Sequence, residues 1–128
     1  MSKRIIHSNA APAAVGPYSQ AIMVESGKTV YLSGQIALDP ATGELVSDNF
    51  EAQVRQCFTN IEAVAAEVGA TLEHVVKLTL YLTDLSKFAS ANAIMGEVIP
   101  QPYPARSTLG VASLPKGAQI EIEAILVL

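Results

Sequence analysis

The feature that most constrains the fold is residues 49–68, where apolar side chains recur with the spacing of a helix. Asp48, followed three residues later by Glu51, predicts a capping pair at its start, and Gly69 stands where a helix end favours left-handed backbone. The apolar residues fall on one face of a 3.6-residue repeat: Phe50, Val54, Cys57, Phe58, Ile61, Val64, Ala65 and Val68. The stretch therefore predicts a long amphipathic helix.

The remaining segments predict a sheet and a second helix. Residues 75–82 alternate, with Val76, Leu78, Leu80 and Leu82 on one face and Lys77, Thr79 and Tyr81 on the other. A second helix is expected over residues 84–98, ended by Pro100. Strands are expected at residues 5–8, 18–25, 29–36, 105–111 and 118–128, with a hairpin turn at Ser26-Gly27. This order predicts one α+β domain over residues 1–128, with both helices on one face of a mixed sheet.

The last strand has no simply polar face. Glu121 and Glu123 share a face with Ile125 and Val127, while the other face is apolar. Half of the 128 residues are hydrophobic and only 16% are charged, against about 25% in a typical domain. A small domain leaves much of its surface exposed, so we expect a homo-oligomer that buries a second apolar face. The alternative is a well-packed monomer with an apolar pocket.

Composition also disfavours several classes of function. The net charge is −4 and the basic residues are scattered, which argues against a nucleic-acid binder. No apolar run has membrane-spanning length, and the N-terminal MSKRIIHSNAAP lacks the apolar core of a secretory signal. Cys57 is the single cysteine, so no internal disulfide can form. A cytoplasmic protein is expected.

Metal and thiol chemistry find little support. His7 and His74 do not stand in ligand spacing, so no metal is expected and both are assigned surface or capping roles. Cys57 lies on the apolar face of the predicted helix, where it should pack as a small hydrophobic residue.

Arg106 and two glutamates are better candidates for a site. Arg106 follows Pro102 and Pro104, and its planar fork suits a carboxylate. It could equally form an internal ion pair with Glu121 or Glu123, or be a solvated charge at a sheet edge. The two glutamates lie about 7 Å apart on one strand face, where they could serve acid–base chemistry or simply form a polar face.

Weaker candidates surround them. Tyr18 and Asn92 offer hydroxyl and amide groups of the kind that orient a polar ligand, and Thr108 shares the strand face of Arg106. Ser33-Gly34 is too short to be specific, since Gly34 could be only a strand glycine at a close backbone approach.

Taken together, several stretches resemble the reactive intermediate deaminase family, the RidA or YjgF-type proteins. The match runs in order over essentially the whole chain, and PARS followed by IEIEA is its most specific part. The stretches are GPYSQA (16–21), LSGQI (32–36), VKLT (76–79), LTDL (82–85), FASAN (88–92), PYPARS (102–107) and IEIEA (120–124).

The resemblance implies a chorismate-mutase-like α+β fold and a homotrimer. Three sheets would form a central β-barrel, with helices outside and a ligand cleft at each subunit interface. It also implies hydrolysis of reactive 2-imino acids and their enamine tautomers, such as 2-iminobutanoate and 2-iminopropanoate, to 2-oxo acids and ammonia. This activity removes damaging metabolites and needs no cofactor.

By the same resemblance, Arg106 would hold the substrate carboxylate and Glu121 the attacking water, while other residues line the cleft: Tyr18, Ser33, Gly34 and Asn92. Thr108 stands where many members have cysteine, which puts any thiol-dependent mechanism in doubt. Its backbone carbonyl could still accept a bond from the imine nitrogen. Two other functions stay open: non-catalytic binding of a 2-oxo acid, and a ribonuclease activity that the acidic charge disfavours.

Overall fold

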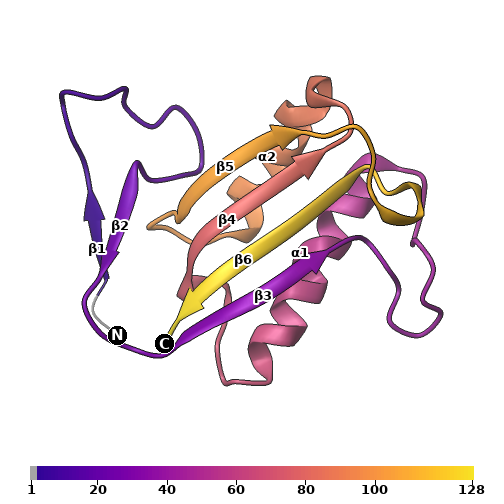
Figure 1. Ribbon diagram of the computed structural model, residues 1–128, viewed down its shortest axis with the longest axis horizontal. Helices are drawn as coiled ribbons and strands as arrows, with labels where there is room; N and C mark the ends of the chain where they lie inside the picture. The colour runs from indigo at the N-terminus through magenta and orange to yellow at the C-terminus, as the bar shows by residue number, and fades with distance from the viewer. Residues whose placement is uncertain (1–2) are drawn as a thin grey trace.

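A four-stranded sheet forms the centre of the computed structural model, which describes residues 3–128 (Figure 1). Its strands lie in the order β3-β6-β4-β5. They are β3 (Thr29–Gln35), β4 (Val75–Leu82), β5 (Ala105–Gly110) and β6 (Ile120–Val127). β6 pairs antiparallel with β3 and β4, whereas β4 and β5 are parallel. A parallel pair needs a crossover connection, which the second helix supplies.

Both helices, α1 (Phe50–Ala66) and α2 (Phe88–Val98), cover the same face of the sheet (Figure 1). Between sheet and helices lies the core, whose fully buried side chains include Leu78, Leu80, Ile120, Ile122 and Ile61. The predicted α+β fold, a mixed sheet with two helices on one face, is therefore confirmed. Three short 3₁₀ helices join the elements: η1 (Leu72–His74), η2 (Leu85–Lys87) and η3 (Pro115–Gly117).

The start of α1 differs from its prediction. Asn49, not Asp48, is the N-cap, and its side-chain Oδ1 accepts a bond from the Ala52 amide at 2.9 Å. Asn49 is extended, which lets its side chain turn back onto the first helical amides. Gly69 has the predicted left-handed backbone, with φ of +72°.

The start of β4 does not follow the predicted alternation of buried and exposed residues. The pairing of β4 with β6 shifts between Val75 and Lys77. Because this irregularity breaks the alternation, Val75 is buried at 1% exposure while Val76 is only partly buried.

The predicted hairpin between residues 18–25 and 29–36 is wrong. β2 (Ala21–Val24) pairs with β1 (Lys3–Ile6), and the two strands stand apart from the main sheet (Figure 1). The chain turns at Gly27, where φ is +128° and an added Cβ would lie 2.7 Å from Val127. Lys28 then exchanges both backbone bonds with Leu128, at 2.7 and 3.0 Å. These bonds align the chain with β6 and leave β2 free to pair elsewhere.

Among residues 3–128, no helix combines the length and apolar character needed to cross a membrane.

Candidate functional site

Arg106 points from β5 toward α2. It pairs with Leu78 of β4, whose side chain is fully buried on the helix-covered face. Paired residues of neighbouring strands point to the same face, and the contacts of Arg106 agree. Its Nη1 donates a hydrogen bond to Asn92 Oδ1 and lies 3.6 Å from the Met95 sulfur, both on α2.

Two aromatic rings flank the same guanidinium. Its Cζ lies 4.7 Å from the ring centre of Tyr18 and 5.1 Å from that of Phe88. Both distances are within the range of a cation–π contact. We call Arg106, Asn92, Met95, Tyr18 and Phe88 the arginine cluster. Its members come from β5, from α2 and from the loop before β2, so they are far apart in sequence.

The arginine cluster contains a cation and no acid. Burial lowers the pKa of Arg106, because desolvation disfavours the charged form, yet an arginine stays protonated in proteins. In the described part of the chain the one ion pair joins Arg55 to Glu97, at 2.9 Å. The alternative of an ion pair between Arg106 and Glu121 or Glu123 is therefore wrong. A half-buried, unpaired guanidinium is suited to binding an anionic ligand.

The loop that carries Tyr18 is attached to the segment before β5. The Ser19 amide donates to the Pro104 carbonyl at 2.9 Å, and its hydroxyl donates to the Tyr103 carbonyl at 2.5 Å. Gly16 leaves room for Asn92, since an added Cβ would lie 3.1 Å from the Asn92 amide nitrogen. The proline-containing stretch thus supplies the acceptors that hold Tyr18 against Arg106.

Thr108 lies on the same face, two residues beyond Arg106. It pairs with Leu80, another fully buried residue of β4. A hollow of about 300 Å³ lies between Thr108, Leu85 and Phe88. Thr108 thus adjoins the arginine cluster through Phe88, which lines the hollow and flanks Arg106.

The glutamates lie on the opposite face of the sheet, which no helix covers. Glu121 pairs with Tyr81 and Glu123 with Thr79. The Tyr81 hydroxyl donates to Glu123 Oε1 at 2.7 Å, and this bond raises the pKa of Tyr81. The Glu121 carboxylate occupies the space over Gly34, where an added Cβ would overlap it.

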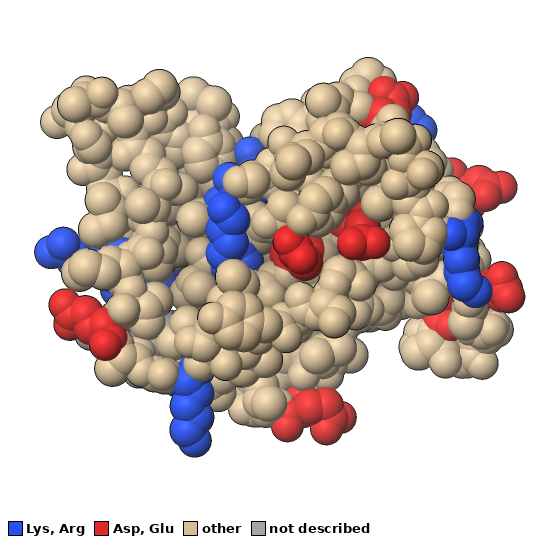
Figure 2. Space-filling view, viewed as in Figure 1, with Lys and Arg blue, Asp and Glu red and all other residues tan. Residues whose placement is uncertain are grey.

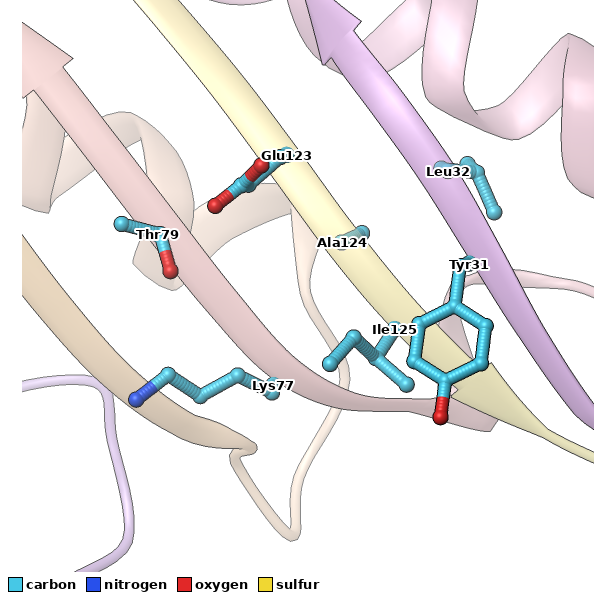
Figure 3. A pocket seen from close by; sticks show the side chains of 7 residues that line it. All are labelled: Tyr31, Leu32, Lys77, Thr79, Glu123, Ala124 and Ile125. Atoms are coloured by element: carbon cyan, nitrogen blue, oxygen red, sulfur yellow. The ribbon is translucent and has the colours of Figure 1, made fainter.

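A shallow pocket of about 250 Å³ opens on this helix-free face (Figure 3). The surface around it is mostly uncharged, with a few acidic and basic groups over the middle of the sheet (Figure 2). Lys77, at the pocket rim, donates to the Ser107 hydroxyl at 3.2 Å. The pocket is lined by Tyr31, Leu32, Lys77, Thr79, Glu123, Ala124 and Ile125.

The candidate residues therefore form two groups rather than one. Arg106, Tyr18, Asn92 and Thr108 meet on the helix-covered face. Gly34 and Glu121 meet on the other face, next to the exposed Ser33. Within one chain the sheet separates Arg106 from Glu121, so a single ligand can touch both only if a second copy supplies one of them.

Two members of the arginine cluster, Phe88 and Met95, were not candidates, and neither was Leu85, which lines the adjoining hollow. Phe88 and Asn92 are, however, four residues apart on α2. That spacing places two side chains on one helix face, so the pair could have been found once Asn92 was suspected.

Cys57 is fully buried on α1, as predicted. Its pKa is raised to about 12, first by burial and then by the charge of Glu121. The thiol donates to the Gln35 carbonyl at 3.3 Å. Since the thiolate is the nucleophile, Cys57 acts as a packing residue at neutral pH. His74, expected in a surface or capping role, caps η1: its Nδ1 accepts from the Thr71 amide at 3.0 Å.

Comparison with known proteins identifies the family. Residues 8–128 match the family model described as Endoribonuclease L-PSP. The chain is 47% identical to Protein DfrA of Myxococcus xanthus, over 99% of this chain and 97% of that protein. It is 46% identical to the 2-iminobutanoate/2-iminopropanoate deaminase of Dermatophagoides farinae, over 98% and 97%.

A solved structure is also similar to this chain over almost its whole length. RidA from the Antarctic bacterium Psychrobacter sp. PAMC 21119 has a TM-score of 0.77 and 49% identity, covering 98% of this chain and 99% of that one. Matches of this extent in sequence and in structure show that the chain belongs to the reactive intermediate deaminase family, the RidA or YjgF-type proteins.

Proposed function

We propose that this protein hydrolyses 2-imino acids and their enamine tautomers to 2-oxo acids and ammonia, with 2-iminobutanoate and 2-iminopropanoate as substrates. The observation that carries the proposal is the half-buried Arg106, which is surrounded by aromatic and amide groups and has no acidic partner. Such a cation favours a small carboxylate. The name of the relative from Dermatophagoides farinae supports the same reaction.

The mechanism begins at the carboxylate. Arg106 binds it through the planar guanidinium, and the protonated imine nitrogen faces the Thr108 carbonyl. A water held by Glu121 adds to C2 and loses a proton to the Glu121 carboxylate. The protonated Glu121 then donates this proton to the nitrogen, and the C2–nitrogen bond breaks to release ammonia. The C2 hydroxyl loses its proton to solvent and becomes the carbonyl of the 2-oxo acid. One water is consumed and one ammonia released for each imine.

This mechanism requires more than one copy of the chain, because Arg106 and Glu121 lie on opposite faces of the sheet. We therefore propose a homotrimer in which the helix-free faces surround a central barrel and each ligand cleft lies between subunits. Supporting this, the helix-free face carries Tyr31, which is 76% exposed and pairs with the partly exposed Ile125. Adjoining exposed apolar side chains are typical of an interaction surface.

The test couples the purified protein to a threonine dehydratase and traps the released imine with semicarbazide. We expect the protein to shorten the lifetime of the imine and so reduce the semicarbazone signal. A protein that leaves the lifetime unchanged at every concentration would refute the deaminase proposal.

Non-catalytic binding of a 2-oxo acid is the second candidate. The observation in its favour is that the arginine cluster is complete within one chain, whereas Glu121 lies elsewhere. Calorimetric binding of 2-oxobutanoate, together with an unchanged imine lifetime, would establish this function instead.

A further inference from the structure

Gln119, directly before β6, connects several segments of the chain at one end of the sheet. Its main-chain amide donates to Gln53 Oε1 at 2.9 Å, and its carbonyl accepts from the Thr83 amide at 3.2 Å. Its side chain donates to the Asp48 carbonyl at 2.6 Å and accepts from Lys87 Nζ at 2.7 Å. Every nitrogen and oxygen of Gln119 is therefore bonded, and together they tie α1, β4 and η2 to the start of β6.

Gln53 anchors this network in the core. Its side chain is 1% exposed, and among residues 3–128 it is the one buried polar or charged residue. Its amide nitrogen donates to the Ser47 carbonyl at 2.8 Å, so both ends of the side-chain amide are bonded. Breaking either bond would leave a buried polar group without a partner, which is costly. Gln119 is thus a fixed point to which Lys87 is attached.

Lys87 holds the start of α2. It occupies the N-cap position of this helix, where no side-chain bond caps the first turn. Its ammonium instead bonds to Gln119 and lies 5.4 Å from the ring centre of Phe50, within the range of a cation–π contact. The next residue is Phe88, whose ring centre lies 5.1 Å from the guanidinium carbon of Arg106. The lysine therefore fixes the turn that carries one of the two rings of the arginine cluster.

We propose that Lys87 is a positioning residue for carboxylate binding, which, held by Gln119, keeps the ring of Phe88 against Arg106. Arg106 has no acidic partner, so its orientation depends on contacts with neutral groups such as this ring. Loosening the first turn of α2 would release the ring and let the guanidinium adopt orientations that do not bind the ligand. The inference rests on the proposed function and adds a residue that acts through Phe88 without touching the ligand.

Lys87→Met tests this role, because it keeps an unbranched side chain and removes the ammonium. Calorimetric binding of 2-oxobutanoate should weaken by about 3- to 5-fold, which corresponds to the loss of one exposed cation–π contact. Since Arg106 holds substrate and transition state alike, KM for the imino acid should rise by the same factor while kcat stays within about 2-fold. Lys87→Arg keeps a charged donor for Gln119 and should restore binding to within about 2-fold of the parent.

A second substitution, Phe88→Leu, shows whether Lys87 acts through the ring. In the Phe88→Leu protein, adding Lys87→Met should change 2-oxobutanoate binding by less than about 2-fold, because the group that the lysine positions is gone. A lysine that only stabilised the fold would lower the melting temperature of both proteins and leave binding unchanged. Lys116→Met is the matched control, since it also removes one lysine bond, to the Gly43 carbonyl at 3.0 Å, and should bind like the parent.

Two results would overturn the positioning role: a Lys87→Met protein that binds 2-oxobutanoate as tightly as the parent, or an equal weakening with and without the Phe88 ring. If either occurs while the parent still shortens the imine lifetime, the proposed function stands and only the positioning role is wrong. If the parent neither binds 2-oxobutanoate nor shortens the imine lifetime, both are wrong.

Discussion

Replacing Arg106 with lysine preserves the positive charge and removes the planar fork. In the protein, one guanidinium nitrogen bonds to Asn92, and the guanidinium carbon lies 4.7 Å from the ring centre of Tyr18 and 5.1 Å from that of Phe88. A lysine ammonium is a compact charge that cannot offer two parallel donors to a carboxylate. Losing one charge-assisted hydrogen bond costs about 1.5–3 kcal/mol. We therefore expect kcat/KM for the imino acid to fall by about ten- to a hundredfold.

Two assays measure this effect: semicarbazide trapping for imine hydrolysis, and calorimetry for 2-oxobutanoate binding. Arg106→Lys should weaken both, because the same carboxylate contact serves substrate and product. Arg55→Lys is the matched control, since Arg55 is half-exposed and pairs with Glu97 away from the arginine cluster. If Arg106→Lys bound 2-oxobutanoate as tightly as the parent, Arg106 would serve only to position Asn92 and the two rings.

Four further outcomes are expected. Glu121→Gln should lower kcat by about 10²–10⁴ while 2-oxobutanoate binding survives; equal loss of both would show that Glu121 does not act as a base. Cys57→Ala should keep its activity and lose about 1 kcal/mol of stability by chemical denaturation, whereas loss of turnover in a folded protein would contradict the packing role. Sedimentation equilibrium at micromolar concentration should give three times the chain mass of 13.5 kDa, and a monomer would refute the shared cleft. The pKa of Asp84 is lowered from its ordinary value of 3.8 by the bonds to Ser86. The ionised Asp84 therefore stabilises the fold at pH values above 3.8, and this contribution is lost as the pH falls through the lower pKa of the folded state. The melting temperature of Asp84→Asn should accordingly depend less on acid pH than that of the parent.

The local patterns of the sequence predicted most of the elements. The apolar repeat of residues 49–68 and the alternation of residues 75–82 became α1 and β4. Both patterns depend on short-range geometry, the 3.6-residue turn of a helix and the two-residue repeat of a strand, so they are visible without knowledge of the neighbours. The same holds for Cys57, whose burial follows from its place on the apolar stripe.

Only the tertiary structure decided which strands pair with each other. Ser26-Gly27 resembles a hairpin turn, yet β2 pairs with β1. The backbone of Lys28 bonds instead to Leu128, and that of Ser19 to Pro104. Hydrogen bonds to segments this distant in sequence compete with the local turn, and no local pattern reveals which will form.

The relation of Arg106 to Glu121 was decided in the same way. The alternation along a strand shows which of its residues share a face. It does not show whether that face is the helix-covered or the helix-free face of the sheet. The register with β4 decides it: Arg106 pairs with Leu78 and Glu121 with Tyr81. Leu78 and Tyr81 are three residues apart on an alternating strand, so their side chains point to opposite faces. The sequence thus identified the candidate side chains, whereas strand pairing placed them on two sides of one sheet.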